Sequence, residues 1–491
     1  MEPKVWYAGI IKQRKRDDDV KQGRLSAGKR QDVDMTQGPV ARHLIWFALP
    51  LLAGNLFQQF YNMVDTWVVG NYVSNEAFSA VGTVGPIINM LIGFFLGLSS
   101  GAGVVISQYY GAKQYDKVQD TVHTAMLMTL GLGVVFTTLG IAMTPPMLRF
   151  MKTPSEVFPE SKAYLTIYFA GMMGLMVYNM GAGILRAVGD SRRPFFFLVV
   201  SAVLNVILDL VFVIVFQAGV RGVAYATILS QGVSAVLTLW TLARSPSCIR
   251  LTFSALKLHR DMLAKIVRVG IPAALQMAVT SFSNVFVQSY INYFGADCMS
   301  GWTAYTKIDQ LIFLPMQSLA LSATTFVGQN LGIRDVDRAK KGTRAAFCMS
   351  LGLTAVIIAA VMIFAPWLVA FFNRKPAVVQ YGTMLLRHMS PFYLLCCVNQ
   401  VYSGALRGAG KSRVPMVIML SSFVLFRQCY LFIMANFIAN EILPIAMSYP
   451  AGWFVCSSLT LIYYQKNGLS GAGLIDAPTA AERSESYEKS L

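Results

Sequence analysis

Charge is scarce in this chain. Only 13% of its 491 residues are Asp, Glu, Lys or Arg, whereas 55% are hydrophobic and the mean hydropathy is +0.52. This composition is too apolar for a soluble protein of this length and predicts an integral membrane protein. Basic residues outnumber acidic ones by 41 to 24, but they lie in short loops between apolar runs. They therefore indicate membrane topology and argue against a nucleic-acid partner.

Residues that bind metals or act as nucleophiles are also few. The seven cysteines have no metal-ligand spacing, and the four histidines are isolated from one another. A nucleophile paired with a base and a His-Glu-x-x-His sequence are both missing, which argues against an intramembrane enzyme. A repeated selectivity filter, as expected for a passive channel, is missing too. We therefore expect no enzymatic activity and no cofactor.

Long apolar runs dominate the rest of the chain and predict an all-α integral membrane fold with twelve transmembrane helices. The runs cover residues 43–70, 79–109, 122–144, 161–185, 195–217, 222–243, 264–293, 300–329, 344–370, 382–406, 414–438 and 445–465. Residues 1–38 form a basic arm and residues 467–491 a polar tail, and we expect both to be disordered. The arm has the wrong flanks for a signal peptide, and translation from Met1 and from Met35 are both left open.

The apolar core repeats itself at an offset of 221 to 222 residues. Gln108 and Gly111 recur as Gln329 and Gly332, and residues 185–194 recur as residues 406–415. Such a repeat is typical of a two-lobed transporter whose lobes have the same orientation.

The repeat predicts two six-helix lobes, at residues 39–243 and 264–466, joined by a linker at residues 244–263. Twenty-one Lys and Arg residues lie on the linker side of the predicted spans, and seven lie on the other side. The positive-inside rule then places the linker and both termini in the cytoplasm.

Ionisable residues inside the predicted spans are rare, and their cost in a bilayer makes each a functional candidate. They are Asp65 in the first span, Asp209 in the fifth, Lys307 and Asp309 in the eighth, and Arg427 in the eleventh. Two carboxylates that face one cavity of low dielectric need a cation, which is a proton, a sodium ion or a charged substrate.

Neutral polar residues accompany the two carboxylates of the first lobe. Asn62 shares a helix face with Asp65, and Asn205 shares one with Asp209. Asn179 in the fourth span and Thr227 in the sixth supply further oxygens. Hydrogen bonds between helices explain such neutral residues equally well.

Two prolines occupy matching places in the repeat. Pro50 lies in the first span and Pro272 in the seventh. Each removes a backbone donor, so each produces either a static kink or a working hinge.

The chain resembles the multidrug and toxic compound extrusion (MATE) family over residues 38–466. The resemblance rests on Asn-x-x-Asp at Asn62 and on the motif from Arg186 to Pro194. It is most similar to a bacterial branch with a cation site in the first lobe, which Asp65, Asn205, Asp209 and Thr227 match one by one. Asn179 matches an asparagine of the same network. The resemblance implies that these four residues hold a sodium ion or that a carboxylate takes a proton.

The resemblance implies a monomeric antiporter of the bacterial cytoplasmic membrane. It would export small amphipathic, cationic organic compounds in exchange for H⁺ or Na⁺, with membrane lipid around it. The alternative is a flippase of a lipid-linked saccharide precursor, which needs several cavity cations where only Lys307 and Arg427 are available. The acids that other branches carry in helices seven and ten are missing. For the second lobe we expect a structural pair between Asp309 and Arg427.

Overall fold

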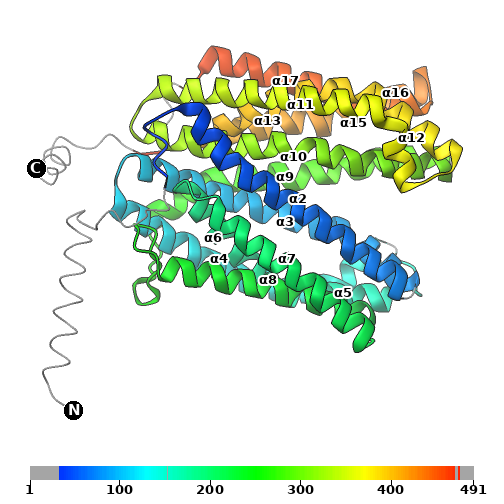
Figure 1. Cartoon of the computed structure of the whole chain (residues 1–491), viewed down its shortest axis with the longest axis horizontal. Helices are drawn as coiled ribbons and strands as arrows, with labels where there is room; N and C mark the ends of the chain where they lie inside the picture. The colour runs from blue at the N-terminus through cyan, green and yellow to red at the C-terminus, as the bar shows by residue number, and fades with distance from the viewer. Residues whose placement is uncertain (1–32, 74, 152, 470–473, 476–491) are drawn as a thin grey trace, which may run out of the picture. The chain divides into compact units, whose positions relative to one another are not determined.

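The computed structural model describes residues 33–73, 75–151, 153–469 and 474–475, without the side chains of residues 65–67, 69–71, 75–79, 86, 282 and 285. Residues Asp34–Leu474 form one compact unit. Every regular element in these ranges is helical (Figure 1), as expected in a bilayer, where each backbone polar group needs a partner within the chain.

The first half of the unit holds the helices of the predicted first lobe. They are α2 (Val40–Tyr72), α3 (Asn75–Gly111), α4 (Tyr115–Phe150), α5 (Phe158–Ala170), α6 (Met172–Ala187), α7 (Arg192–Leu210), η1 (Val211–Val215) and α8 (Gly219–Ala243). A short turn, η2 (Phe253–Ala255), lies in the predicted linker.

The second half begins with α9 (Arg260–Ile291), which ends in the turn η3 (Asn292–Phe294). The remaining elements are α10 (Ala296–Gly332), α11 (Val336–Phe372), α12 (Pro376–Met389), η4 (Ser390–Phe392), α13 (Tyr393–Gly408), α14 (Arg413–Leu420), η5 (Ser421–Phe426), α15 (Arg427–Ile433), η6 (Met434–Ile438), α16 (Ile442–Ala446) and α17 (Ser448–Asn467).

The predicted spans coincide with these helices. Within the described residues, ten helices are long and apolar enough to cross a membrane, and the bent pair α5 and α6 makes an eleventh. The predicted span at residues 382–406 corresponds to α12, η4 and α13, where a short 3₁₀ turn at Ser390 to Phe392 interrupts the helix. The all-helical, multi-pass fold is therefore confirmed.

The repeat is visible in the backbone. Lys113 follows α3 with φ of 58°, and Arg334 follows α10 with φ of 64°. This left-handed conformation is unusual for residues other than glycine, so its occurrence at matching positions reflects one turn geometry used twice. Gly189 and Gly410 repeat a positive φ in the same way after α6 and α13.

Two helices of the different lobes lie side by side along a stripe of small residues. In Figure 1, α3 and α9 run next to each other. A Cβ atom at Gly97 would overlap the backbone of Ala274, and one at Gly101 would overlap Gly270. Close approach of two membrane helices requires such small residues at the contact.

The two terminal arms depart from the prediction of disorder where the structure describes them. Met35, inside the predicted 1–38 arm, is only 1% exposed, and its backbone N–H donates to Oε1 of Gln329 at 2.9 Å. In the predicted tail, Leu469 is buried, and the N–H of Leu474 donates to Oε1 of Gln108 at 2.8 Å. These residues are ordered because apolar side chains find a core and their N–H groups find acceptors. Residues 1–32, 470–473 and 476–491 lie outside the described residues.

Candidate ion-coupling site

The polar residues predicted on the fifth and sixth spans lie on the contact between α7 and α8. The hydroxyl of Ser201 in α7 donates to the carbonyl of Ser230 in α8 at 2.8 Å, which fixes the register of the two helices. Asn205 is one turn further along α7, and Thr227 is one turn further in the opposite direction along α8. Because the connection between α7 and α8 is short, the helices are antiparallel, and this register brings Asn205 next to Thr227.

Burial is nearly complete at this contact. Asp209 is 0% exposed, Asn205 is 1% exposed and Thr227 is 3% exposed. The hydroxyl of Thr227 donates to the carbonyl of Val223 on its own helix at 2.9 Å, which leaves its oxygen lone pairs able to accept or coordinate. A fully buried carboxylate within a membrane helix is costly, which makes Asp209 a functional candidate of the first lobe.

Asp65 and Asn179 are the other members of the predicted set. The backbone of Asp65 lies in α2, which packs against α7, but its side chain lies outside the described residues. Asn179 is buried in α6; its amide nitrogen donates to the carbonyl of Leu175, and its own carbonyl accepts the hydroxyl of Ser99 from α3. Asn205, Asp209 and Thr227 are thus all buried on α7 and α8, whereas Asn179 is tied to α3.

The second lobe does not contain the expected pair of Asp309 with Arg427. The carboxylate of Asp309 accepts the hydroxyl of Tyr393, whose oxygen lies 2.8 Å from that of Tyr305. Arg427 instead donates to Oγ of Ser283 at 2.7 Å and to Oδ1 of Asn284 at 2.9 Å. The prediction of a pair was therefore wrong, because each charged group finds closer neutral partners.

The remaining candidates have simpler surroundings. Lys307 and Asn62 are exposed on α10 and α2. Pro50 and Pro272 each lie inside an unbroken helix, and their role as hinges stays a prediction.

Two matching glutamines join the lobes at one end of the unit. The sequence showed them only as members of the repeat. Nε2 of Gln108 in α3 donates to the carbonyl of Gly408 at 2.9 Å, and Nε2 of Gln329 in α10 donates to the carbonyl of Ala187 at 2.9 Å. Each glutamine thus bonds the end of a helix in the opposite lobe. We call this pair, Gln108 and Gln329, the glutamine lock.

Residues near the two ends of the chain donate hydrogen bonds to the side-chain oxygens of the glutamine lock. Oε1 of Gln329 accepts the N–H of Met35, and Oε1 of Gln108 accepts the N–H of Leu474. Both side-chain amides are fully buried and use donor and acceptor together. The signal in the sequence was the repeated Gln followed three residues later by Gly, but nothing in it named the partners.

Exposed residues follow the close contact of α3 with α9 on both helices. On α9 the stripe that contacts α3 runs through Gly270, Ala274 and Met277, and its next turns reach Asn284, which is exposed. On α3 the same contact continues past Gly93 to Met90, which is 37% exposed. The close contact of α3 with α9 therefore runs from Gly101 to Gly93.

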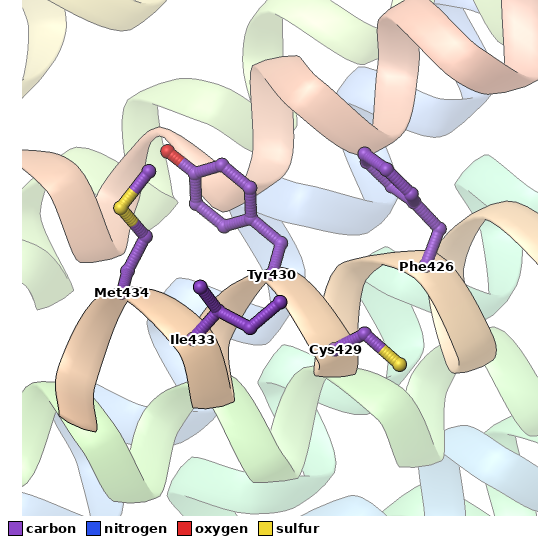
Figure 2. Close-up of a pocket in the computed structure, with 5 residues that line it drawn as sticks. All are labelled: Phe426, Cys429, Tyr430, Ile433 and Met434. Atoms are coloured by element: carbon purple, nitrogen blue, oxygen red, sulfur yellow. The ribbon is translucent and has the colours of Figure 1, made fainter. Parts of the chain in front are cut away.

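A pocket of about 320 Å³ lies along α15 and the adjoining ends of η5 and η6, and it is lined by Phe426, Cys429, Tyr430, Ile433 and Met434. Figure 2 shows that Phe426, Tyr430 and Met434 project to the same side of the helix. Ile433 is 47% exposed. Such an apolar face on a membrane helix suits contact with lipid tails and offers nothing to hold an ion.

The arrangement defines a class of protein. A multi-pass helical unit built from two repeats, with buried polar groups inside one lobe, is the architecture of a secondary transporter. The family model MatE matches residues 50–211 and 272–431. The chain belongs to the MatE family, as the motifs at Asn62 and Arg186 indicated. Members of this family are transporters, which agrees with the expectation of no enzymatic activity.

Curated relatives cover most of the chain. It is 29% identical to "Probable multidrug resistance protein YpnP" of Bacillus subtilis, over 88% of this chain and 96% of that protein. It is 26% identical to "Probable multidrug resistance protein NorM" of Thermotoga maritima, over 87% and 92%. It is 22% identical to "Multidrug export protein MepA" of Staphylococcus aureus, over 77% and 83%.

Solved structures share the fold. A transporter of the MOP superfamily from Pyrococcus furiosus matches with a TM-score of 0.85 at 22% identity, over 91% of this chain and 100% of that chain. An outward-facing multidrug resistance MATE family transporter matches with a TM-score of 0.84 at 22% identity, over 89% and 98%. The twelve-helix, two-lobed architecture is therefore that of this family.

Proposed function

We propose that this chain is a monomeric secondary antiporter that exports amphipathic, cationic organic compounds in exchange for H⁺ or Na⁺. It works in the bacterial cytoplasmic membrane with both termini in the cytoplasm and needs no cofactor. The names of its relatives, which are multidrug resistance and multidrug export proteins, support drug export. They give no support to the flippase alternative.

The observation that carries the proposal is Asp209, which is fully buried on α7 one turn from the buried Asn205. A carboxylate at that depth is stable only when a cation or a proton neutralises it. Coupling then follows because the ion-loaded lobe and the ion-free lobe differ in electrostatics and favour different arrangements. Drug affinity changes with the arrangement, which is the requirement for exchange.

The lobes support alternating access. We infer that, with the termini in the cytoplasm, the glutamine lock holds the lobes together at the cytoplasmic end and the lobes open on the other side; the two hydrogen bonds of the lock support this arrangement. This arrangement releases drug outward and admits the coupling ion from outside. Opening toward the cytoplasm requires the glutamine lock to break.

We favour protons as the coupling ion. A site that accepts and releases a large organic cation gains from a group that can become neutral, and a proton needs only one carboxylate. Sodium needs several oxygen ligands, which Asp65, Asn205, Asp209 and Thr227 would supply. Drug efflux from vesicles, driven by a pH gradient alone and by a sodium gradient alone, tests the choice. If neither the pH gradient nor the sodium gradient drives efflux, antiport is contradicted.

The orientation is tested by labelling. In a chain whose exposed Cys348 and Cys429 are replaced by serine, a membrane-impermeant thiol reagent should label Arg374→Cys in intact cells and leave Lys257→Cys unlabelled. The reverse pattern would place the termini outside.

A further inference from the structure

Arg427 is a buried positive charge that forms no ion pair with any residue whose side chain the structure describes. Its side chain is 2% exposed. Its hydrogen-bond acceptors, Ser283 and Asn284, are neutral, and its Nε has no acceptor among the described residues. Burying a guanidinium in a membrane protein without a negative partner is costly, which indicates that an anion completes the site.

The groups around the guanidinium cannot supply that anion. Asp309, the counter-ion expected from sequence, is held by Tyr393. The hydroxyl of Ser283 already donates to the carbonyl of Phe423 at 2.6 Å. The ring of Tyr449 lies 4.7 Å from the guanidinium carbon and contributes a cation–π contact, which orients the guanidinium without neutralising it.

The buried guanidinium is connected to an exposed residue through its hydrogen bond to Asn284. That residue is exposed and lies on the stripe of α9 that contacts α3 nearer the glutamine lock. The apolar pocket of Figure 2 is lined by Phe426 and Tyr430. Arg427 and Leu431 of α15 do not line it and are buried. Arg427 therefore serves the interior of the transporter and not its lipid-facing surface.

We propose that Arg427, with Ser283 and Asn284 as neighbours, is an anion-binding subsite for the carboxylate of amphipathic zwitterionic substrates. The inference rests on the proposed export function and extends its substrate class from simple cations to zwitterions. A guanidinium binds a carboxylate with two parallel hydrogen bonds, and the subsite holds Nε available for one of them. Binding requires Asn284 to swing aside or to share the carboxylate.

Two dyes with the same fluorophore test the proposal. Rhodamine 110 carries a free carboxylate, and rhodamine 123 is its methyl ester. Fluorescence anisotropy with the purified full chain gives a Kd for each. Arg427→Gln should weaken binding of rhodamine 110 about tenfold, as expected for a lost charge-assisted pair, and change that of rhodamine 123 less than about twofold. Equal effects on both dyes would indicate a structural role and overturn the proposal.

Further variants keep the test valid if Arg427→Gln does not fold. Asn284→Asp keeps the guanidinium but places a carboxylate beside it. It should therefore weaken the binding of rhodamine 110 and leave the binding of rhodamine 123 unchanged. Arg427→Lys should give an intermediate loss, because it keeps the charge without the planar fork. Lys307→Gln removes the other intramembrane cation and should leave the ratio of the two Kd values unchanged. If Lys307→Gln selectively weakened the binding of rhodamine 110 and the Arg427 and Asn284 variants did not, the assignment of the subsite to Arg427 would be overturned.

Two controls separate the outcomes. A wild-type chain that binds and transports neither dye contradicts the proposed function, whereas one that handles rhodamine 123 but shows no Arg427-dependent preference contradicts only this inference. Dihexanoyl phosphatidic acid tests a lipid phosphate as the source of the anion. We expect it not to displace rhodamine 110; displacement with a Kd below that of the dye would overturn the zwitterion assignment.

Discussion

At the scale of single residues, Asp209 has the most direct consequence. Asp209→Asn keeps the size of the side chain and removes its charge, so it should reduce ion-driven efflux at least about tenfold without affecting membrane insertion. Asp116→Asn, which neutralises an exposed acid at the start of α4, is the control and should retain full efflux. Vesicle transport at matched protein levels measures both. Normal coupling in Asp209→Asn would remove Asp209 from the mechanism.

Thr227 separates the two coupling ions. Thr227→Val preserves the shape and deletes one oxygen, and the Val223 carbonyl keeps its backbone partner in the helix. With proton coupling, efflux driven by a pH gradient should be nearly unchanged. With sodium coupling, the apparent sodium affinity should fall about fivefold or more, as expected for a lost ligand. Ser230→Ala, which deletes a hydroxyl that bonds only the Thr227 carbonyl, is the matched control.

Sequence reasoning found the charged residues but not all of their partners. Asn205, Asp209 and Thr227 could be predicted together because helix periodicity places the first two on one face and the motif supplied the third. The partners of Asp309 and Arg427 could not be predicted, since the contacts with Tyr393 and Ser283 depend on how helices distant in sequence pack.

At the scale of elements, the α3–α9 contact depends on the absence of side chains. Gly97→Ala adds a Cβ that meets the Ala274 backbone, so it should cost about 1–3 kcal/mol and lower the midpoint of thermal unfolding. Gly82→Ala on the same helix, where nothing lies within 4 Å of the added atom, should be neutral or stabilising. An unchanged midpoint in Gly97→Ala would show that the helices contact each other elsewhere.

Hydropathy located the spans well but could not show their breaks. The bend of 47° between α5 and α6 and the turn at Ser390 both lie inside runs that are apolar enough to be continuous. Helix interruptions in membranes are tolerated when neighbouring helices supply partners, and those neighbours are not visible in a local window of sequence.

At the scale of the whole molecule, we expect the glutamine lock to hold the two lobes together at one end. Gln108→Leu combined with Gln329→Leu removes hydrogen bonds worth about 1 kcal/mol each, so hydrogen exchange at residues 105–114 and 326–335 should accelerate several-fold per lost bond. Gln288→Leu, which loses only an exposed bond to Asn292 near the opposite end of α9, is the control. If hydrogen exchange in these segments were equal in the double variant and the control, the glutamine lock would not hold the lobes together.

The two lobes followed from the repeat, and their orientation stays a prediction from the distribution of Lys and Arg. Their contact through the glutamine lock did not follow from either, because a buried glutamine amide gives no sign of its acceptor in the sequence. The contacts of the two arms could not be predicted for a similar reason. Met35 and Leu474 lie in polar segments whose composition favours disorder, yet each donates a buried hydrogen bond.

The glutamine lock also constrains how the chain is made. Gln108 belongs to the first lobe, but its two partners, Gly408 and Leu474, are synthesised hundreds of residues later. Met35 likewise waits for Gln329 to leave the ribosome. The Gln108 end of the first lobe therefore lacks its partners throughout synthesis of the second lobe, and assembly is complete only when the last helix has been released. A ribosome that stalls within α17 would leave a membrane-inserted chain whose two ends are not yet fastened.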